Sequence, residues 1–386
     1  MRKTIAIVLL IALCACFAPL PAAAESAVAP PSVSAKAAVL MEAGTGRVLY
    51  AVNDREHLAM ASTTKIMTAL LTLEAGDPDT FFTVDPDAIR VEGSSMGLVE
   101  GDQVTRRSLS YGMLLPSGND AANAGAVSVA GSVPAFVELM NARARKIGMV
   151  DTLFVTPSGL DGEGHASTAY DMALLTREAL RNDTFREICS ARSVQVEFGN
   201  PPYLRWLSNS NKMLKYYDGA MGVKTGFTDR AGRCLVSAAE RNGVRLIAVT
   251  LNAPDDWNDH TKMLDYGFAT VKPLPLSYDD SAWKLPVAGS QDTEQSIGLK
   301  AVGSPTACVP EEEVASVQTR LLVPAFVYAP VAAGDEVGAL QFVWNGTVVY
   351  EAPLIAVQDA PAYLPPAKTS PLESLARFFK GLFGGT

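Results

Sequence analysis

Short apolar runs occur at two distant places in the first two thirds of the chain, and both places predict strands. Residues 38–41 and 48–50 are apolar and flank a glycine-bearing turn, which predicts a β-hairpin. Residues 234–236 and 246–249 are also apolar and are separated by Asn242-Gly243, a dipeptide typical of tight turns. The two groups of strands enclose a long region with a different pattern.

Apolar residues recur at helical spacing between these strands. Residues 62–75 predict a helix with Ile66, Leu70 and Leu73 on one face. A second predicted helix follows Ser132, a residue type that caps helices, and ends at Gly148, a residue type that terminates them. Its predicted apolar face consists of Phe136, Leu139 and Met140. Helices between strands predict an α+β fold, in which a sheet is covered by helices and carries a helical insert.

The pattern changes near residue 273, where two prolines precede strand-like runs. Within the segment 342–350, Asn345-Gly346 separates two apolar runs, and this dipeptide is typical of a two-residue hairpin turn. A chain of 386 residues is also longer than one usual domain. We therefore predict one domain over residues 35–272 and a small all-β domain over residues 273–362, which serves as a spacer or interaction module.

The N-terminus predicts a secretion signal over residues 1–24. Two basic residues precede the apolar stretch 5–13, and Ala22-Ala23-Ala24 offers a cleavage site of small residues. The stretch is shorter than the roughly 20 residues of a spanning helix, which favours cleavage over a retained anchor. Lipid attachment at Cys16 is a weaker alternative. Residues 25–34, rich in Ala, Pro and Ser, predict a linker, so the mature protein is expected outside the cytoplasm.

The C-terminus predicts a proline-rich linker and an amphipathic helix within residues 363–386. In the segment 372–383 the apolar residues fall on one side at 100° per residue and the charged residues on the other. Such a helix is too short to cross a bilayer and instead favours association with the membrane surface. The exported protein is therefore expected at the outer face of the cytoplasmic membrane or elsewhere in the cell envelope. A helix docked on its own protein is the alternative.

Composition excludes some functions. Hydrophobic residues make up 48% of the chain and charged residues 19%, which argues against disorder. The net charge of −9 disfavours binding to nucleic acid, which needs clustered Lys and Arg. After signal cleavage Cys189, Cys234 and Cys308 remain, an odd set that predicts buried thiols rather than a disulfide framework, with one bridge as the alternative. Their spacing indicates no metal site.

One segment imitates a serine nucleophile motif. Residues 93–97 read Gly-Ser-Ser-Met-Gly, which places Ser95 in the Gly-x-Ser-x-Gly pattern of α/β-hydrolases. That motif needs a strand before the serine and a helix after it, whereas the residues that follow predict strand or turn. A Ser-His-Asp enzyme would also need one of only three histidines, His57, His165 and His260, as its base. This interpretation is disfavoured.

A second pattern is spread over three short motifs. Ser62 and Lys65 lie at the predicted start of a helix, where a spacing of three places them on one face. Backbone N–H groups and the positive helix end favour the negative charge that develops at such a serine, and a lysine of lowered pKa could take its proton. Ser117-Gly118-Asn119 follows on a predicted tight turn, and Lys224-Thr225-Gly226 begins the strand-rich end of the domain. There Gly226 would let a substrate backbone lie against the edge strand.

The chain resembles the low-molecular-mass penicillin-binding proteins, the serine-type D-alanyl-D-alanine carboxypeptidases. The resemblance covers residues 35–270, and the all-β domain and amphipathic tail also fit the architecture of that family. It implies the fold of penicillin-binding proteins and β-lactamases, a sheet covered by helices with a helical subdomain. The residues that carry it are 59–70, Leu114-Leu115-Pro116-Ser117-Gly118-Asn119-Asp120-Ala121-Ala122, Phe136-Val137-Glu138-Leu139-Met140-Asn141, Gly148-Met149, Pro157-Ser158-Gly159-Leu160 and Gly222-Val223-Lys224-Thr225-Gly226-Phe227-Thr228.

The resemblance implies a role for each motif residue in removal of the terminal D-alanine from peptidoglycan stem peptides that end in D-Ala-D-Ala. Ser62 is expected to attack and form an acyl-enzyme, with Lys65 as proton acceptor and Ser117 as proton relay. Asn119, Lys224, Thr225 and Gly226 are expected to bind substrate. The oxyanion hole is expected from the backbone N–H groups of Ser62 and Phe227. Water then resolves the acyl-enzyme without a metal or cofactor, and β-lactam antibiotics are expected as covalent inhibitors.

Two other functions stay open at this point. A class A-like β-lactamase of the same fold would need a glutamate that activates the deacylating water, and Glu138 and Glu163 are the available candidates. A catalytically silent penicillin-binding sensor or scaffold is disfavoured by the intact motifs. Some relatives also use an arginine near the substrate carboxylate, and the spacing does not choose among Arg233, Arg241 and Arg245.

Overall fold

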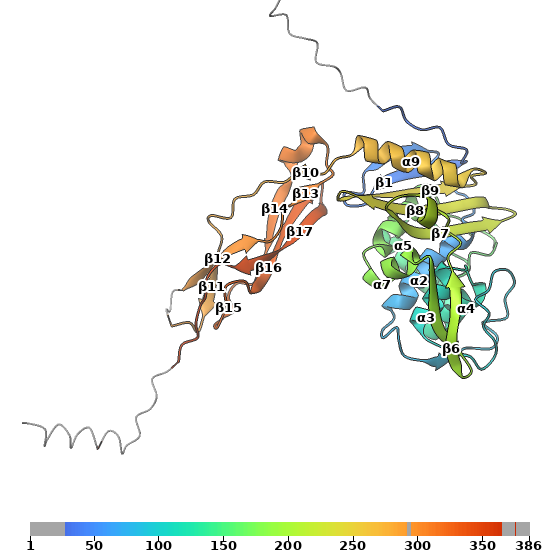
Figure 1. Cartoon of the computed structure of the whole chain (residues 1–386), viewed down its shortest axis with the longest axis horizontal. Helices are drawn as coiled ribbons and strands as arrows, with labels where there is room; N and C mark the ends of the chain where they lie inside the picture. The colour runs from blue at the N-terminus through green and yellow to red at the C-terminus, as the bar shows by residue number, and fades with distance from the viewer. Residues whose placement is uncertain (1–27, 292–294, 365–374, 376–386) are drawn as a thin grey trace, which may run out of the picture. The chain divides into compact units, whose positions relative to one another are not determined.

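The computed structural model describes residues 28–291, 295–364 and 375 (Figure 1). The predicted signal peptide, residues 1–24, lies outside the described residues, as does the predicted helix 372–383 apart from Leu375. The chain divides into two compact units. Unit 1 comprises residues 1–40, 49–239 and 247–270, and unit 2 comprises residues 41–48, 240–246 and 271–386.

A five-stranded sheet in the order β2-β1-β9-β8-β7 forms the framework that carries the site. The runs predicted near residues 38–50 and 234–249 therefore join one sheet, as expected. The turn between β8 and β9 uses Asn242 and Gly243 with φ values of 51° and 80°. The strands are β1 (Ala37–Glu42), β2 (Val48–Val52), β7 (Ala220–Thr228), β8 (Gly232–Arg241) and β9 (Val244–Leu251).

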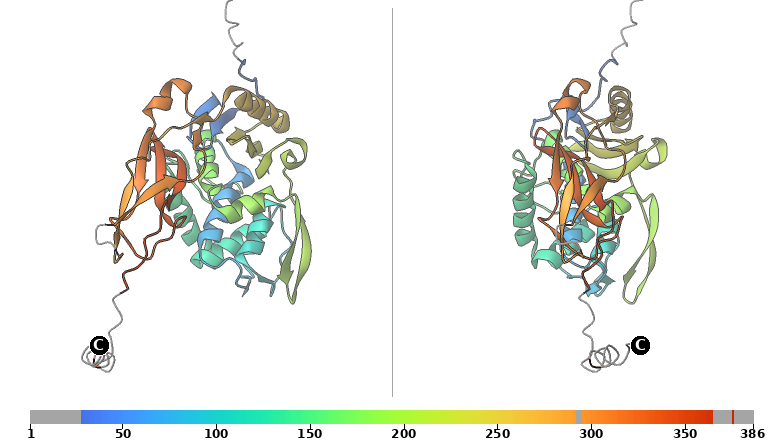
Figure 2. Two further views of the ribbon diagram at one scale, coloured as in Figure 1. Left: turned by 60° about the vertical axis from the view of Figure 1, so that its left-hand side comes forward. Right: turned by 90° about the vertical axis from the view of Figure 1, so that its left-hand side faces the viewer.

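Helices cover both faces of this sheet. Figures 1 and 2 show α9 on one face and the helical insert, which contains α2 to α5, on the other. The α+β fold class, with helices over a sheet and a helical subdomain, is confirmed. The helices are the 3₁₀ turn η1 (Ala61–Thr64), α2 (Lys65–Glu74), α3 (Arg106–Leu114), α4 (Asn119–Ala130), α5 (Val133–Ile147), α6 (Ala169–Ala179), α7 (Asp183–Ser190), α8 (Met213–Tyr216) and α9 (Asp256–Thr270).

Helix α5 begins and ends where the sequence predicts. The Ser132 hydroxyl accepts a hydrogen bond from the Ala135 N–H, and Gly148 ends the helix at a φ of 90°. One part of the prediction was wrong, because Leu139 is 43% exposed. The buried stripe is instead formed by Phe136, Met140 and Ala144, which are spaced four residues apart. Residues four apart form a narrow stripe along a helix. Leu139 therefore lies beside the stripe rather than within it.

A second sheet of unit 1 was not predicted. Its order is β3-β4-β5-β6, and most of it is the hairpin β5–β6. Residues 202–206 of this hairpin are largely exposed on both faces, so the sequence lacks the alternation of apolar and polar residues that identifies a half-buried strand. The strands are β3 (Phe82–Thr83), β4 (Gln103–Val104), β5 (Ser193–Gly199) and β6 (Pro202–Ser208).

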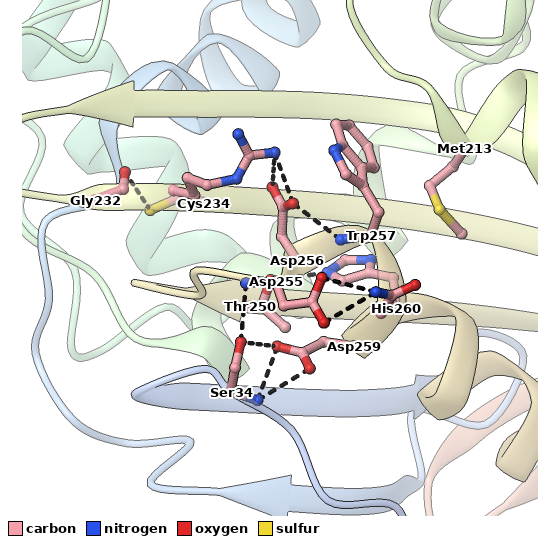
Figure 3. Close-up of polar contacts among 12 residues, drawn as sticks. Ser34, Met213, Gly232, Cys234, Thr250, Asp255, Asp256, Trp257, Asp259 and His260 are labelled. Atoms are coloured by element: carbon pink, nitrogen blue, oxygen red, sulfur yellow. Dashed lines mark hydrogen bonds and ion pairs between the residues drawn. The ribbon is translucent and has the colours of Figure 1, made fainter.

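The first turn of α9 ties the start of the described chain to the sheet (Figure 3). The Asp259 carboxylate accepts hydrogen bonds from the Ser34 backbone N–H at 2.9 Å and from its hydroxyl at 2.7 Å. The Asp255 N–H donates back to the Ser34 hydroxyl oxygen at 3.0 Å. The next residue of α9, His260, is buried with its Nε2 2.9 Å from the Thr250 hydroxyl on β9. These contacts fix α9 against the sheet on the side away from the helical insert.

Unit 2 has its own apolar core, formed by residues such as Leu285, Leu340 and Phe342. The predicted hairpin is present, because Asn345 and Gly346 join two long strands with φ values of 47° and 77°. Within residues 271–291 and 295–364, the unit is all-β apart from the 3₁₀ turn η2 (Glu311–Ser316). Its strands are β10 (Leu274–Pro275), β11 (Lys284–Ala288), β12 (Ser296–Ala301), β13 (Thr306–Ala307), β14 (Gln318–Leu322), β15 (Val327–Tyr328), β16 (Glu336–Trp344) and β17 (Thr347–Ala356).

The described residues also bear on the cysteine and membrane predictions. Cys189, Cys234 and Cys308 are free and buried, as the odd count indicates. Among the helices that the structure describes, none has the length and apolar character needed to span a bilayer.

Truncation of the α5 stripe should destabilise unit 1. Phe136 is fully buried, so Phe136→Ala should lower the free energy of unfolding by about 3–5 kcal/mol through lost burial and a cavity. Leu139→Ala on the same helix should cost less than about 1 kcal/mol, because that side chain is already 43% exposed. Urea unfolding followed by circular dichroism measures both values. Equal losses in the two variants would contradict the assigned face.

Candidate active site

The predicted nucleophile lies in a tight turn rather than inside an α-helix. Ser62 belongs to the 3₁₀ turn η1, and the α-helix α2 begins only at Lys65. Residues three apart eclipse each other in a 3₁₀ turn, so Ser62 and Lys65 lie on one side. The preceding residue, Ala61, has a φ of +48°, a left-handed conformation that is strained for a residue with a Cβ. Ser62 is partly exposed while Ala61 and Lys65 are buried.

The Lys65 amine is the centre of the site. Its Nζ donates to the Ser62 Oγ at 2.9 Å, to the Asn119 Oδ1 at 2.7 Å and to the backbone carbonyl of Ser158 at 2.6 Å. An ammonium group has three hydrogens, and these contacts use all of them. As a neutral amine, Lys65 keeps two of these bonds and offers its lone pair to the Ser62 hydroxyl.

Burial decides the protonation of Lys65. Its side chain is fully buried, and burial together with the nearby Lys224 holds the pKa of Lys65 well below its usual value. The carboxylate of Asp120 acts in the opposite direction and raises that pKa. The lowered pKa favours the neutral amine, which is the form that can accept a proton.

The second motif reaches the site from the turn before α4. Ser117 has a φ of +69°, and its hydroxyl accepts a hydrogen bond from the Lys224 Nζ at 2.9 Å. Asn119 is the first residue of α4 and is 4% exposed. Its Nδ2 donates to the Glu92 carbonyl at 2.6 Å, which leaves Oδ1 for Lys65. Lys65 thus joins the first motif to the second, and Lys224 joins the second motif to the third.

The third motif lies on β7, the last strand in the sheet order. Lys224 is fully buried, and burial lowers its pKa to about 7. Its Nζ also donates to the Thr225 carbonyl at 2.8 Å, while the Thr225 hydroxyl lies 2.8 Å from the hydroxyl of Ser210. Phe227, two residues further along, is 62% exposed. Lys224 therefore links the edge strand to Ser117.

Gly226 lies directly against the turn that carries Ser62. A Cβ at this position would lie 3.1 Å from the Met60 carbonyl oxygen and 3.2 Å from the Ser62 nitrogen. The missing side chain therefore lets β7 approach the turn that carries Ser62. Gly159 has a similar effect, because a Cβ there would overlap the Ala61 carbonyl oxygen.

Ser95, the alternative nucleophile, does not have the surroundings that its motif requires. Ser95 lies in an irregular segment, and within residues 91–99 the structure has neither the strand nor the helix that the hydrolase motif requires. Its hydroxyl donates to the Asp120 carboxylate at 2.5 Å. His165 is buried and uses its Nδ1 to accept from the Val155 N–H and its Nε2 to contact Thr64. Burial lowers the pKa of His165 to about 4, so this ring stays neutral.

The surroundings of the two candidate glutamates and the three candidate arginines show which of them lie near the site. Glu138 and Glu163 are both exposed, unlike the buried Lys65 and Asn119. Among the three arginines, Arg233 lies opposite Phe227 in the β7–β8 register and is held by Asp256 at 2.7 Å. Arg245 pairs with Glu240 at the other end of β8. Only Arg233 is therefore near the third motif.

Three residues of the site were not predicted. Ser158 contributes a backbone carbonyl, which no residue type signals. Ser210 contacts Thr225 from the segment that follows β6, a strand that was itself missed. Asp120 is buried beside Asn119, and like Ser158 it stands in a stretch that carries the family resemblance without a predicted role of its own. The assembled groups, a serine hydroxyl, two buried lysines and a second serine, suit acyl transfer to a serine.

Comparisons with known proteins agree with this chemistry. The family model described as D-alanyl-D-alanine carboxypeptidase matches residues 24–255, and the model described as the C-terminal domain of penicillin-binding protein 5 matches residues 275–362. The D-alanyl-D-alanine carboxypeptidase DacF of Bacillus subtilis is 35% identical over 84% of this chain and 85% of its own length. DacC of Escherichia coli is 36% identical over 89% and 88%. The crystal structure of penicillin-binding protein 5 from Haemophilus influenzae has a TM-score of 0.61 and 29% identity, and covers 86% of this chain and 99% of that chain.

The fit between Gly159 and the Ser62 turn can be tested with a matched pair of glycines. Gly159→Ala should displace the Ala61 carbonyl and slow labelling of Ser62 by a fluorescent penicillin about 100-fold, the effect expected of a misplaced reacting group. Gly164→Ala is the control, because Gly164 also has a positive φ of 76° but its Cβ would meet only the Leu153 side chain, at 3.1 Å. Similar labelling rates in the two variants would show that Gly159 does not set the position of Ser62.

Proposed function

The chain belongs to the D-alanyl-D-alanine carboxypeptidase family, and from that membership we propose a residue-by-residue mechanism for its reaction. The reaction is removal of the terminal D-alanine from peptidoglycan stem peptides by a serine-type enzyme, which also binds penicillins. In the proposal the acyl-enzyme forms on Ser62. The single observation that carries it is the 2.9 Å contact between the Ser62 hydroxyl and the buried amine of Lys65.

Acylation begins with proton transfer from Ser62 to neutral Lys65. The Ser62 Oγ attacks the carbonyl carbon of the penultimate D-alanine, and its proton passes to the lone pair of the Lys65 amine. The low pKa of Lys65 supports this role, since an ordinary lysine would be protonated at neutral pH and could not accept a proton. The hydrogen bonds to Asn119 and Ser158 keep the amine pointed at Ser62 throughout the transfer.

The amide bond to the terminal D-alanine then breaks. Ser117 relays to the leaving amine the proton that Lys65 took from Ser62, while the hydrogen bond from the Lys224 Nζ holds the Ser117 oxygen in place. The oxyanion formed in the tetrahedral intermediate is held by the backbone N–H groups of Ser62 and Phe227, and loss of one such donor typically costs about 10²- to 10³-fold in rate. Water subsequently attacks the acyl-enzyme and frees the shortened peptide.

Substrate binding uses the two sides of the site. Lys224 and Thr225 hold the terminal carboxylate, with Lys224 as the cation and Thr225 as a hydroxyl donor. Asn119 orients the substrate amide through the part of its side chain that faces Lys65. Gly226 serves indirectly, because it allows β7 to lie against the Ser62 turn.

The two alternative functions have less support. A β-lactamase of class A needs a glutamate beside the acyl-enzyme to activate water, and Glu138 and Glu163 are exposed to solvent. A silent sensor does not require a buried lysine in contact with a serine. Such a lysine is costly to bury, and catalysis gives it a purpose.

The function is tested with a peptide that ends in D-Ala-D-Ala. The purified protein should release free D-alanine, measured enzymatically, and should form a long-lived adduct with penicillin. Ser62→Ala should abolish both activities, since the hydroxyl that attacks the carbonyl is removed. Penicillin labelling without D-alanine release would support the silent-sensor function. Rapid hydrolysis of penicillin would support the β-lactamase.

We propose further that the protein is exported and rests on the membrane through its C-terminal segment. The support is the sequence of residues 1–24 and the amphipathic pattern of residues 372–383. Deletion of residues 368–386 should shift the protein from the membrane fraction to the soluble fraction, because the apolar side of the helix is lost. Immunoblots of separated membranes measure this, and an unchanged distribution would contradict the anchor.

A further inference from the structure

The segment 92–98, which contains the Gly-Ser-Ser-Met-Gly sequence at residues 93–97, lies directly against the second motif. The Ser94 carbonyl accepts the Asn119 backbone N–H at 2.7 Å, and the Glu92 carbonyl accepts the Asn119 Nδ2 at 2.6 Å. A Cβ at Gly93 would lie 2.7 Å from that Nδ2, so only glycine permits the approach. The segment therefore fixes both the backbone and the side chain of Asn119.

Asp120 in turn holds this segment in place. Its Oδ2 accepts hydrogen bonds from the Ser95 hydroxyl at 2.5 Å, the Gly97 N–H at 3.1 Å and the Leu98 N–H at 3.0 Å. Its Oδ1 accepts from the Met96 N–H at 2.9 Å and from the Ala121 N–H at 2.8 Å. The residue is 2% exposed. An ionised carboxylate is the side chain that accepts at both oxygens and donates at neither, so it matches this ring of donors.

The contacts form a path from Asp120 to the Lys65 amine. Asp120 holds the segment, and the segment occupies the Nδ2 of Asn119. The amide of Asn119 then has one orientation, in which Oδ1 faces the Lys65 Nζ at 2.7 Å. Two charged groups act on Lys65 from the elements packed around it: Lys224 from β7 and Asp120 from α4. Asp120 thus reaches Lys65 both through hydrogen bonds and through its charge.

We propose that Asp120 is a positioning residue for acylation, which sets the geometry of Lys65 through the 92–98 segment and Asn119. The proposal rests on the proposed roles of Ser62, Lys65 and Asn119. It also gives the Gly-Ser-Ser-Met-Gly sequence a function, since Ser95 serves as a donor to Asp120 instead of a nucleophile. Asp120 does not touch substrate in this proposal.

The decisive variant is Asp120→Asn. An asparagine has nearly the same shape but presents an NH₂ group to one set of the donors, so the segment loses its attachment on that side. Acylation of Ser62 by a fluorescent penicillin should slow about 10- to 100-fold, because the reacting groups are misplaced. Stopped-flow or quenched labelling over a range of pH measures the rate, and the labelled fraction at completion counts folded sites.

The pH profile separates positioning from a merely structural role. The neutral form of Lys65 is the proton acceptor, and Asp120 raises the pKa of Lys65. Removal of this anion lowers that pKa further, so the neutral form persists to lower pH. The acidic limb of the acylation rate should therefore move to lower pH in Asp120→Asn. A variant that is only partly unfolded would lose labelled sites at every pH and keep the limb in place.

Two further variants complete the test. Asp85→Asn is the matched control, because Asp85 also accepts two backbone N–H groups, from Asp87 at 2.9 Å and Ala88 at 2.8 Å, but is exposed. It should leave the rate and the acidic limb unchanged. Ser95→Ala removes one donor and keeps the charge, so it should slow acylation less than Asp120→Asn without moving the limb. If Asp120→Asn does not fold, a wild-type rate in Ser95→Ala overturns the proposal.

A folded Asp120→Asn protein with the wild-type rate, or with an unmoved acidic limb, also overturns it. The readout is penicillin acylation, so it does not depend on peptide hydrolysis. Failure of the wild-type protein to release D-alanine would contradict the proposed function while the role of Asp120 could still be measured.

Discussion

The Lys65 amine is the interaction on which the rest of the site depends. Three separate parts of unit 1 meet at this one nitrogen: the turn that carries Ser62, the first residue of α4, and the Ser158 carbonyl. Burial of a lysine is unfavourable unless each hydrogen finds an acceptor or the proton is lost. The site satisfies both conditions, because three acceptors surround the amine and burial favours its neutral form. Burial destabilises the ammonium form of Lys65 and so favours the neutral amine, which can act as a base.

Close backbone approach is the second constraint, and glycines make it possible. Gly159 and Gly226 both lie close to the backbone of the turn before α2, and Ala61 within this turn adopts a positive φ. A side chain at either glycine would meet the backbone of residues 60–62. Gly226 therefore belongs as much to the construction of the nucleophile as to the binding of substrate. Its place beside Lys224 and Thr225 couples the edge strand to Ser62.

Local signals in the sequence predicted much of this structure, and tertiary contacts account for the rest. The cap at Ser132 and the hairpin at Asn345-Gly346 follow from the preferences of single residues, and the structure has both. The resemblance in the three motifs named the side chains that contact the Lys65 and Lys224 amines, which are Ser62, Asn119 and Ser117. Ser158 was missed because its carbonyl is an atom that all residues share. The hairpin β5–β6 was missed because much of it is exposed on both faces.

The segment around Ser95 shows why a motif alone does not identify a nucleophile. A serine hydroxyl becomes nucleophilic when a neighbouring group can accept its proton. A lysine can do so only as the neutral amine, after its own extra proton has been lost. Ser62 faces an amine whose pKa is lowered by burial and by Lys224. Ser95 faces a carboxylate whose two oxygens already accept four backbone N–H groups, and its hydroxyl donates to that carboxylate. The two serines differ in their partners, and the partners are set by the fold rather than by the residues adjacent in sequence.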